Sequence, residues 1–270
     1  MNKLSIAAAI CAALCVSPAQ ARKKPEPTPA KPAPYASTYQ AIASAPVLIQ
    51  NATVLTGTGE RLDNADVLMQ DGKIQAVGKA LSPPGNAKII NGAGKWVTPG
   101  IIDVHSHLGV YANPGIQATS DGNEATNAVT ANVWAEHSVW PQDAGFAKAL
   151  AGGVTSMQIL PGSANLVGGR SVILKNVAAT TFQAMKFPDA PYGIKMACGE
   201  NPKRVYGEKG GPSTRMGNMA GYRAAFIGAE AYRRKWDAYE KGGRQGDAPD
   251  QDLANDTLAG VLRGDVTVNI

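Results

Sequence analysis

Short runs of apolar and alternating residues fill the chain between Pro46 and Trp96, and Gly, Asn and Asp separate them. These separating residues favour turns, so the runs are typical of β-strands. The dipeptide Asp71-Gly72 stands between two of the runs and predicts a hairpin, because Gly adopts a positive φ at little cost. We expect a small β-sandwich domain over residues 46–97, with strands at 47–49, 52–55, 65–69 and 73–77.

After Pro99 the pattern changes to strands that alternate with helical stretches. Strands are expected at 101–107, 154–160, 171–175, 193–198 and 266–270, and helices at 142–151, 217–241 and 251–263. Such alternation favours a parallel α/β architecture, most simply a (β/α)8 (TIM) barrel. A full barrel takes roughly 250 residues, more than the chain offers after Pro99. The predicted fold class is therefore a truncated barrel over 98–270, preceded by the β-sandwich domain.

The first residues resemble a targeting segment. Lys3 precedes an apolar run over 4–16 that is too short to span a bilayer, and Ala19-Gln20-Ala21 fits a small-x-small cleavage site. We expect a signal peptide over 1–21, cleaved after Ala21, and hence a periplasmic or secreted protein. An uncleaved anchor is the alternative interpretation.

Residues 22–45 are rich in Pro, Ala and Lys and predict a polar tether. The formal net charge of the chain is +5, but no basic face is interleaved with aromatic residues, so nucleic-acid binding is not expected. Membrane contact is not expected after cleavage either. Cys11 and Cys15 leave with the signal peptide, and Cys198 alone cannot form an internal disulfide.

The candidate chemistry lies at the end of the run 101–107, where His105 and His107 are spaced i and i+2. Residues two apart on a strand share a face, so both imidazoles leave the strand in the same direction. Two neutral imidazoles on one strand form half of a divalent-metal site. The alternative is a pair of polar residues that close a strand. His137, the third and last histidine, has no partner at metal spacing and is expected on the surface.

The segment Val97-Thr98-Pro99-Gly100-Ile101-Ile102-Asp103-Val104-His105-Ser106-His107 resembles the signature of the metal-dependent amidohydrolase superfamily. Residues 51–57 and 65–78 resemble the small β-domain that precedes the barrel in that superfamily. Residues 151–156 and 162–165 fit its second barrel unit, and 199–207 is similar to a branch with imidazolonepropionase-like and dipeptidase-like enzymes. The resemblance extends from about Val47 to the last residue.

This resemblance implies a set of metal ligands. His105 and His107 match its first pair, and Lys195 lies where some members carry a carboxylated lysine that bridges two metals. An ordinary lysine at the barrel mouth is the alternative for Lys195, and Glu200 is the alternative carboxylate ligand or its neighbour. The implied cofactor is a divalent metal, with zinc as the expected ion, bound as one or two ions. Two further histidines and a general-base aspartate are expected beyond Ile270.

Other polar residues are candidates for supporting roles. Asp103 shares the face of His105 and could orient an imidazole. Loop residues that could contact substrate are Ser163, Asn165, Arg170, Asn201, Lys203 and Arg204. A basic pair such as Lys203 and Arg204 could meet a substrate carboxylate, whereas a Gly-rich turn is the alternative for the residues around Ser163. Ser163 has no base at triad spacing, so a serine hydrolase is not supported.

The activity that the resemblance implies is hydrolysis of a C–N bond in an amide, a dipeptide or a cyclic amide. A metal serves this chemistry by lowering the pKa of bound water and polarising the carbonyl. With two secure ligands, the chain alone is expected to be inactive. The alternative is a non-catalytic secreted fragment or binding module that keeps only the scaffold. The expected partner is a small-molecule substrate, and homo-oligomerisation is left open.

Overall fold

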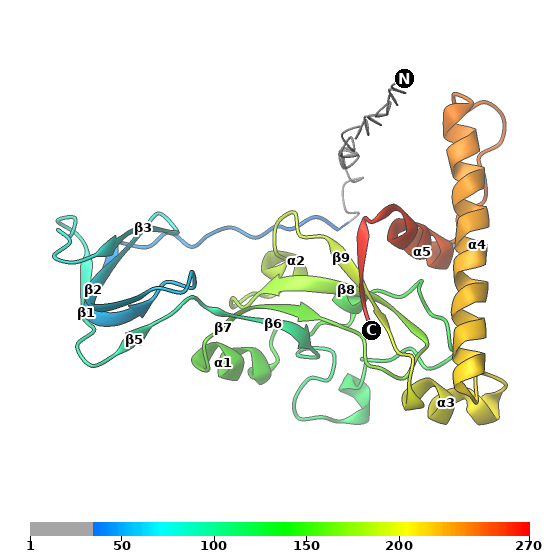
Figure 1. The fold of residues 1–270 in the computed structure, drawn as a ribbon, viewed down its shortest axis with the longest axis horizontal. Coiled ribbons are helices and arrows are strands. Elements are labelled where there is room, and N and C mark those ends of the chain that lie inside the picture. Colours follow the sequence, from blue (N-terminus) through cyan, green and yellow to red (C-terminus); the bar gives the residue numbers. More distant parts are fainter. Residues whose placement is uncertain (1–34) are drawn as a thin grey trace, which may run out of the picture. The chain divides into compact units, whose positions relative to one another are not determined.

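A computed structural model describes residues 35–270 of the chain, and the strands in this range form two five-stranded sheets (Figure 1). The expected signal peptide, and the tether up to residue 34, lie outside the described residues. Within residues 35–270, no helix has both the length and the apolar character that a bilayer span requires.

The first sheet has the order β3-β2-β1-β4, and β5 also pairs with β1. Its strands are β1 (Val47–Leu55), β2 (Arg61–Gln70), β3 (Lys73–Gly78), β4 (Lys88–Asn91) and β5 (Trp96–Val97). The hairpin between β2 and β3 is confirmed, and its two turn residues Asp71 and Gly72 both have positive φ, 52° and 71°.

The described strands of this domain form one sheet, and the two facing sheets of a sandwich stay a prediction. β1 is a single strand where two were expected. The first half of β1 pairs with β4 and its second half with β5, both in parallel. Asn51, with a φ of 59°, lies at the register shift between the two halves. The small core of this sheet consists of Ala52, Val54, Ala65 and Val67.

The second sheet has the order β10-β9-β8-β7-β6 and is a curled half-barrel in a mixed α/β fold. It contains β6 (Ile101–Ser106), β7 (Val154–Ile159), β8 (Val167–Lys175), β9 (Tyr192–Met196) and β10 (Val266–Asn269). The strands β6 and β7 are parallel, as are β9 and β10. The expectation of an all-parallel sheet is wrong, because β8 is antiparallel to both of its neighbours.

The direction of β8 follows from the short connection before it. The segment from Leu160 to Leu166 contains no helix. A parallel pair needs a crossover of a dozen or more residues, so a short link returns the chain in the opposite direction. The sequence pattern also misplaced the start of β8, which begins at Val167 rather than at residue 171.

The expected long helices are confirmed, each beginning close to the predicted residue. They are α1 (Ala144–Ala151), α4 (Arg215–Lys241) and α5 (Leu253–Arg263), with shorter helices α2 (Phe182–Met185) and α3 (Glu200–Tyr206) and single turns η1 (Gln117–Thr119), η2 (Ala135–His137) and η3 (Gly207–Lys209). Asp143, Thr214 and Asp252 cap the three long helices by accepting from backbone N–H groups.

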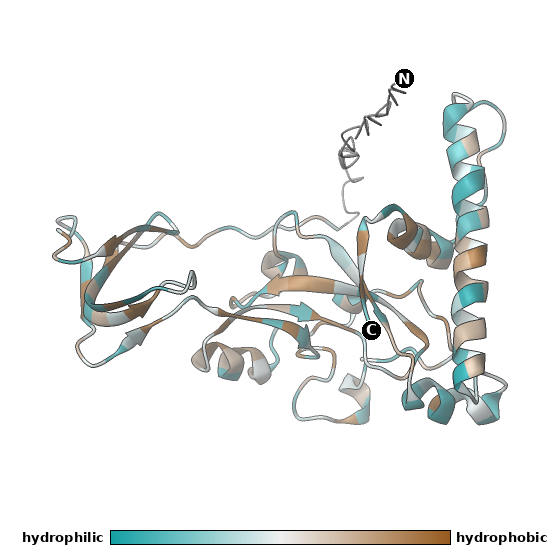
Figure 2. Cartoon of the chain, viewed as in Figure 1, coloured by the Kyte–Doolittle hydropathy of each residue, from teal (hydrophilic) through white to brown (hydrophobic). Residues whose placement is uncertain are grey.

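Two apolar clusters hold the second sheet. One joins α1 to β7 and β8 through Phe146, Met157 and Leu174. The other joins β8 and β9 to α4 and α5 through Val167, Ile194, Tyr222 and Leu258. Hydropathy colouring marks β8 and much of α5 as apolar (Figure 2). The edge strand β6 differs, since its residues Ile101, Ile102 and Val104 are all exposed.

Candidate metal centre and adjoining pocket

The two histidines predicted to bind metal do lie together at the end of β6. The ring centroids of His105 and His107 are 5.2 Å apart, with an interplanar angle of 82°. His105 is exposed and His107 is half-buried. The strand geometry therefore brings the two imidazoles onto one side, as the spacing predicts.

The ring of His107 is held by the neighbouring strand. Its Nδ1 lies 2.8 Å from the carbonyl oxygen of Leu160, the residue that directly follows β7. A carbonyl oxygen can only accept, so Nδ1 carries the proton and donates it. The lone pair then resides on Nε2. Metal-ligating histidines typically donate the N–H of their other ring nitrogen in this way.

Lys195, the third predicted ligand, is the penultimate residue of β9 and is only 5% exposed. Its amine forms no hydrogen bond or ion pair with any residue between 35 and 270. Burial lowers the pKa of Lys195 below its ordinary value. This lysine is therefore buried without a partner that would stabilise its charge.

Lys195 and His105 lie near each other, although β7 and β8 separate their strands in the sheet. The pKa of His105 is lowered by burial first, then by the charge of Lys195 and by His107, whereas Asp103 raises it. The curl of the sheet therefore brings Lys195 close enough to His105 for its charge to lower the pKa of that imidazole. That environment favours the neutral imidazole, which is the form that binds metal.

Asp103 forms a hydrogen bond with the backbone of the residue that it was expected to orient. Its Oδ1 accepts from the backbone N–H of His105 at 3.1 Å. No contact with an imidazole is described for this carboxylate, so its predicted orienting role on the ring stays a prediction. The hydrogen bond fixes the strand end that carries the histidine pair.

These residues fit a divalent cation as a partial donor set. The fit rests on two imidazoles, one with its Nε2 lone pair oriented by a backbone carbonyl, and on a buried amine without a partner. Within the described part of the chain, no group of three His, Cys, Asp or Glu side chains could hold a metal ion. His105, His107 and Lys195 would therefore supply only part of a complete coordination shell.

Two of the residues predicted to contact substrate form hydrogen bonds within the fold. Arg170 donates from Nε to Thr257 Oγ1 at 2.8 Å and from Nη2 to Asp256 Oδ2 at 3.2 Å, which joins β8 to α5. The Asn165 side-chain amide donates to Thr130 and to the carbonyls of Glu124 and Asn127. Ser163 is half-buried. Their predicted contacts with substrate remain predictions.

The residues predicted on α3 pair mainly with one another. Arg204 lies 3.8 Å from Glu200 and 3.4 Å from Asn201 Oδ1, and both residues of the Arg204–Glu200 pair are largely exposed. Lys203 lies in the last turn of the same helix. No described contact joins any of these residues to His105 or His107, so their roles at the site stay predictions.

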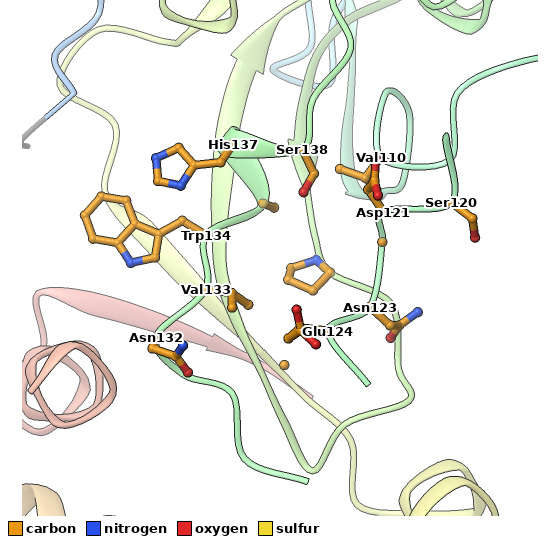
Figure 3. Close-up of a pocket in the computed structure, with 14 residues that line it drawn as sticks. Val110, Ser120, Asp121, Asn123, Glu124, Asn132, Val133, Trp134, His137 and Ser138 are labelled. Atoms are coloured by element: carbon orange, nitrogen blue, oxygen red, sulfur yellow. The ribbon is translucent and has the colours of Figure 1, made fainter. Parts of the chain in front are cut away.

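The sequence analysis did not predict a pocket of about 380 Å³ whose lining includes Asp121, Trp134 and His137 (Figure 3). Most of its lining comes from the loop between β6 and α1, and Pro161 and Gly168 complete it. Pro161 follows the Leu160 that orients His107, and Gly168 faces the carbonyl oxygen of Lys195. His137 is exposed, as expected, and lines this pocket. The polar run 120–124 is the sequence signal that could have indicated it.

Asp143 is a second residue that the sequence analysis missed. Its buried carboxylate accepts from the backbone N–H groups of Gly109, Asn113 and Gly145 and from the Asn113 side chain. Burial opposes ionisation, but the hydrogen bonds outweigh it and lower the pKa of Asp143. The carboxylate therefore fixes both ends of the loop that lines the pocket.

The chain is similar to known amidohydrolases over part of their length. No family model matches the chain. An amidohydrolase, tasK, from Hapsidospora irregularis is 35% identical over 83% of this chain and 26% of its own length. A dihydroorotase from Trichlorobacter lovleyi is 27% identical over 53% of this chain and 28% of its own. The crystal structure of an amidohydrolase from Thermotoga maritima matches with a TM-score of 0.74 and 41% identity, over 80% of this chain and 55% of that one.

The chain thus spans about a quarter of the length of these curated relatives and about half of the solved structure. The match to the Thermotoga protein extends over most of the described residues and rests on both sequence and fold. These similarities support an assignment of the chain to the amidohydrolase superfamily.

Proposed function

We propose that this chain is part of a metal-dependent hydrolase that cleaves the C–N bond of a small amide, dipeptide or cyclic amide. The observation that carries the proposal is the paired imidazoles at the end of β6, with the Nε2 lone pair of His107 left free by the hydrogen bond to Leu160. The similarity to the Thermotoga amidohydrolase supports the same assignment.

In this proposal His105, His107 and Lys195 hold a divalent metal, for which zinc is the proposed ion, in a site for one or two ions. When bound, the metal would activate water and polarise the amide carbonyl. The chain's own residues prepare the site: Leu160 fixes the tautomer of His107, and Asp103 fixes the strand end. The burial of Lys195 favours its neutral amine, the form that can react with carbon dioxide to give a carbamate ligand.

The remaining parts of the proposal concern the whole protein. We place the general-base aspartate and further ligands in a longer chain that closes the half-barrel into a TIM barrel and completes a β-sandwich. This chain alone would then lack turnover. We further propose that the enzyme acts in the periplasm or outside the cell after cleavage at Ala21.

Metal binding by the whole chain tests this proposal. We expect zinc to bind, and the alanine variants at His105 and His107 to bind it more than about 100-fold more weakly, because each loses a direct ligand. His137→Ala is the matched control, since it removes the one other histidine of the chain. Equal zinc affinity in all three variants, or no zinc binding by the parent chain, would favour the non-catalytic binding module instead.

A further inference from the structure

Tyr111 lies beside the candidate metal centre, and the proposed function gives it no role. Its ring meets the imidazole of His107 edge-on, with ring centroids 5.9 Å apart and an interplanar angle of 80°. Tyr111 is 38% exposed, so a molecule bound next to His107 has access to the phenol. The residue is therefore placed to contact a substrate, provided that its hydroxyl offers a free donor or acceptor.

The phenol of Tyr111 is held in one position by the loops around it. The backbone of Tyr111 forms an isolated antiparallel β-bridge with Ser120. Two glycines leave room for the side chain: a Cβ on Gly162 would lie 2.6 Å from the hydroxyl oxygen, and a Cβ on Gly122 would overlap the ring. Both loops are thus shaped around this phenol, and its hydroxyl is preorganised.

The side chain of Asn123 determines which way the hydroxyl group can donate. Asn123 Oδ1 accepts from the backbone N–H of Ala164 at 3.0 Å, and this hydrogen bond assigns the orientation of the amide. Asn123 Nδ2 therefore faces Tyr111 and donates to its hydroxyl oxygen. Because the hydroxyl accepts in that hydrogen bond, its own proton is left for another partner.

Two donors at this point have no acceptor within residues 35–270. One is the O–H of Tyr111, and the other is the second N–H of Asn123 Nδ2, since that nitrogen carries two protons and uses one on Tyr111. The two donor atoms are hydrogen-bonded to each other, so a single oxygen atom can lie within reach of both. Such a pair can bind one carbonyl or carboxylate oxygen through its two lone pairs.

The local charge favours a neutral oxygen over a carboxylate. Asp121 and Glu124 lie two residues and one residue from Asn123 in the chain (Figure 3), and both are exposed. Neither forms an ion pair with a residue of the described range, and no Lys or Arg lines the pocket that Asn123 also lines. An anionic ligand would be repelled by these two charges without a cation to offset them. An amide carbonyl accepts hydrogen bonds without carrying a net charge, so it fits the two donors better.

We propose that Tyr111 and Asn123 are substrate-contacting residues that select a second, neutral carbonyl group next to the scissile amide. The inference rests on the hydrolase function proposed above and narrows its substrates to amides with such a neighbouring carbonyl, for example an N-acylated amino acid amide. Leu160 orients His107, and Gly162, two residues further on, adjoins the Tyr111 hydroxyl. The selected carbonyl would therefore lie beside the metal rather than on it.

Calorimetric titration of the zinc-loaded chain with three hydroxamates of similar length tests this selection. Each probe anchors on zinc through its hydroxamate group. N-acetylglycine hydroxamate adds a neutral carbonyl, succinic monohydroxamate adds a carboxylate at the matching position, and pentanohydroxamate adds neither. We expect the N-acetylglycine probe to bind about fivefold more tightly than pentanohydroxamate, the gain from roughly one neutral hydrogen bond. Succinic monohydroxamate should bind no more tightly than pentanohydroxamate.

Two conservative variants should remove the preference for the neutral carbonyl. Tyr111→Phe loses the hydroxyl but keeps the ring against His107, so the affinities for zinc and for pentanohydroxamate should stay unchanged. Asn123→Asp keeps the acceptor for Ala164 but loses the N–H donor, and should remove the preference as well. Tyr239→Phe is the matched control, because it removes a hydroxyl from a partly exposed tyrosine on α4 and should retain the preference.

Equal affinity for the N-acetylglycine and pentano probes in the parent chain, or a preference that survives Tyr111→Phe, would overturn the inference. Tightest binding of succinic monohydroxamate would show a carboxylate site and would also overturn it. An equal loss of zinc and of all three probes in the Tyr111 variant would mean that the ring only supports His107, which contradicts the inference too. Zinc binding without a carbonyl preference contradicts this inference alone, whereas the absence of zinc binding contradicts the hydrolase proposal and this inference with it.

Discussion

Two lysines with the same burial have opposite surroundings. Lys186 and Lys195 are each 5% exposed. The amine of Lys186 donates to Glu136 Oε2 at 2.7 Å, to the carbonyl of Tyr35 at 2.6 Å and to the Tyr192 hydroxyl. The amine of Lys195 has no such partner among the described residues.

The difference distinguishes Lys186, whose charge is part of the folded structure, from Lys195, which is a candidate for function. A buried ammonium is costly unless it is paired and hydrogen-bonded, and Lys186 meets that condition with its three donors engaged. Glu136 is 1% exposed and also accepts from Tyr192, so the whole cluster is satisfied. Lys195 is buried without compensation, and such unfavourable positions concentrate at functional sites.

Breaking the satisfied cluster should have the largest effect on stability. Lys186→Met leaves Glu136 as a buried carboxylate without its cation, so we expect a loss of about 3–5 kcal/mol in the free energy of unfolding. Urea denaturation measures it. Arg233→Met is the control, because Arg233 pairs with Glu230 and Asp237 on the partly exposed side of α4 and should cost no more than about 1 kcal/mol. Equal losses in the two variants would contradict a special role for the Glu136 cluster.

Asp143 differs from the Lys186 cluster, because hydrogen bonds rather than an ion pair stabilise its buried charge. We expect Asp143→Asn to lower the free energy of unfolding by roughly 1–3 kcal/mol at neutral pH. The folded-state pKa of Asp143 lies below its ordinary value of 3.8. Its contribution is therefore fully present above that value and is lost as the pH falls through the lowered pKa.

Urea denaturation at several pH values measures this dependence. The gap between wild type and the Asn variant should stay constant from neutral pH down to about pH 5 and narrow below about pH 4. Asp63→Asn is the control, since Asp63 is exposed and pairs with Arg61 at the surface. A gap that widens toward acid would show that the carboxylate of Asp143 is not the stabilising species.

The sequence predicted features that depend on local spacing. The histidine pair, the hairpin at Asp71-Gly72 and the long helices all follow from periodicity within a few residues. The antiparallel direction of β8 was missed, because it depends on how a short link returns along the sheet. The single sheet formed around β1 was missed because β4 and β5 share one partner strand.

The contacts of buried charges could not be predicted for a related reason. Glu136 and Lys186 are fifty residues apart, and Arg170 meets Asp256 at an even larger separation. No spacing rule links such residues, so the sequence predicts Arg170 as a substrate contact and does not indicate the pairing of Lys186. Lys195 was singled out by resemblance, and the structure adds the fact that it lacks a partner.

The last prediction applies the substitution used at Lys186 to its counterpart. Lys195→Met removes an amine that is buried without a partner, so the free energy of unfolding should change by less than about 1 kcal/mol or should rise. Zinc affinity should fall in the same variant if Lys195 is a ligand, and Lys186→Met should leave zinc affinity unchanged in the fraction that folds. Urea denaturation and zinc titration of both variants measure the two effects. A loss of stability at Lys195 as large as that at Lys186 would mean that the amine is engaged in the fold, and the contrast between the two lysines would then be wrong.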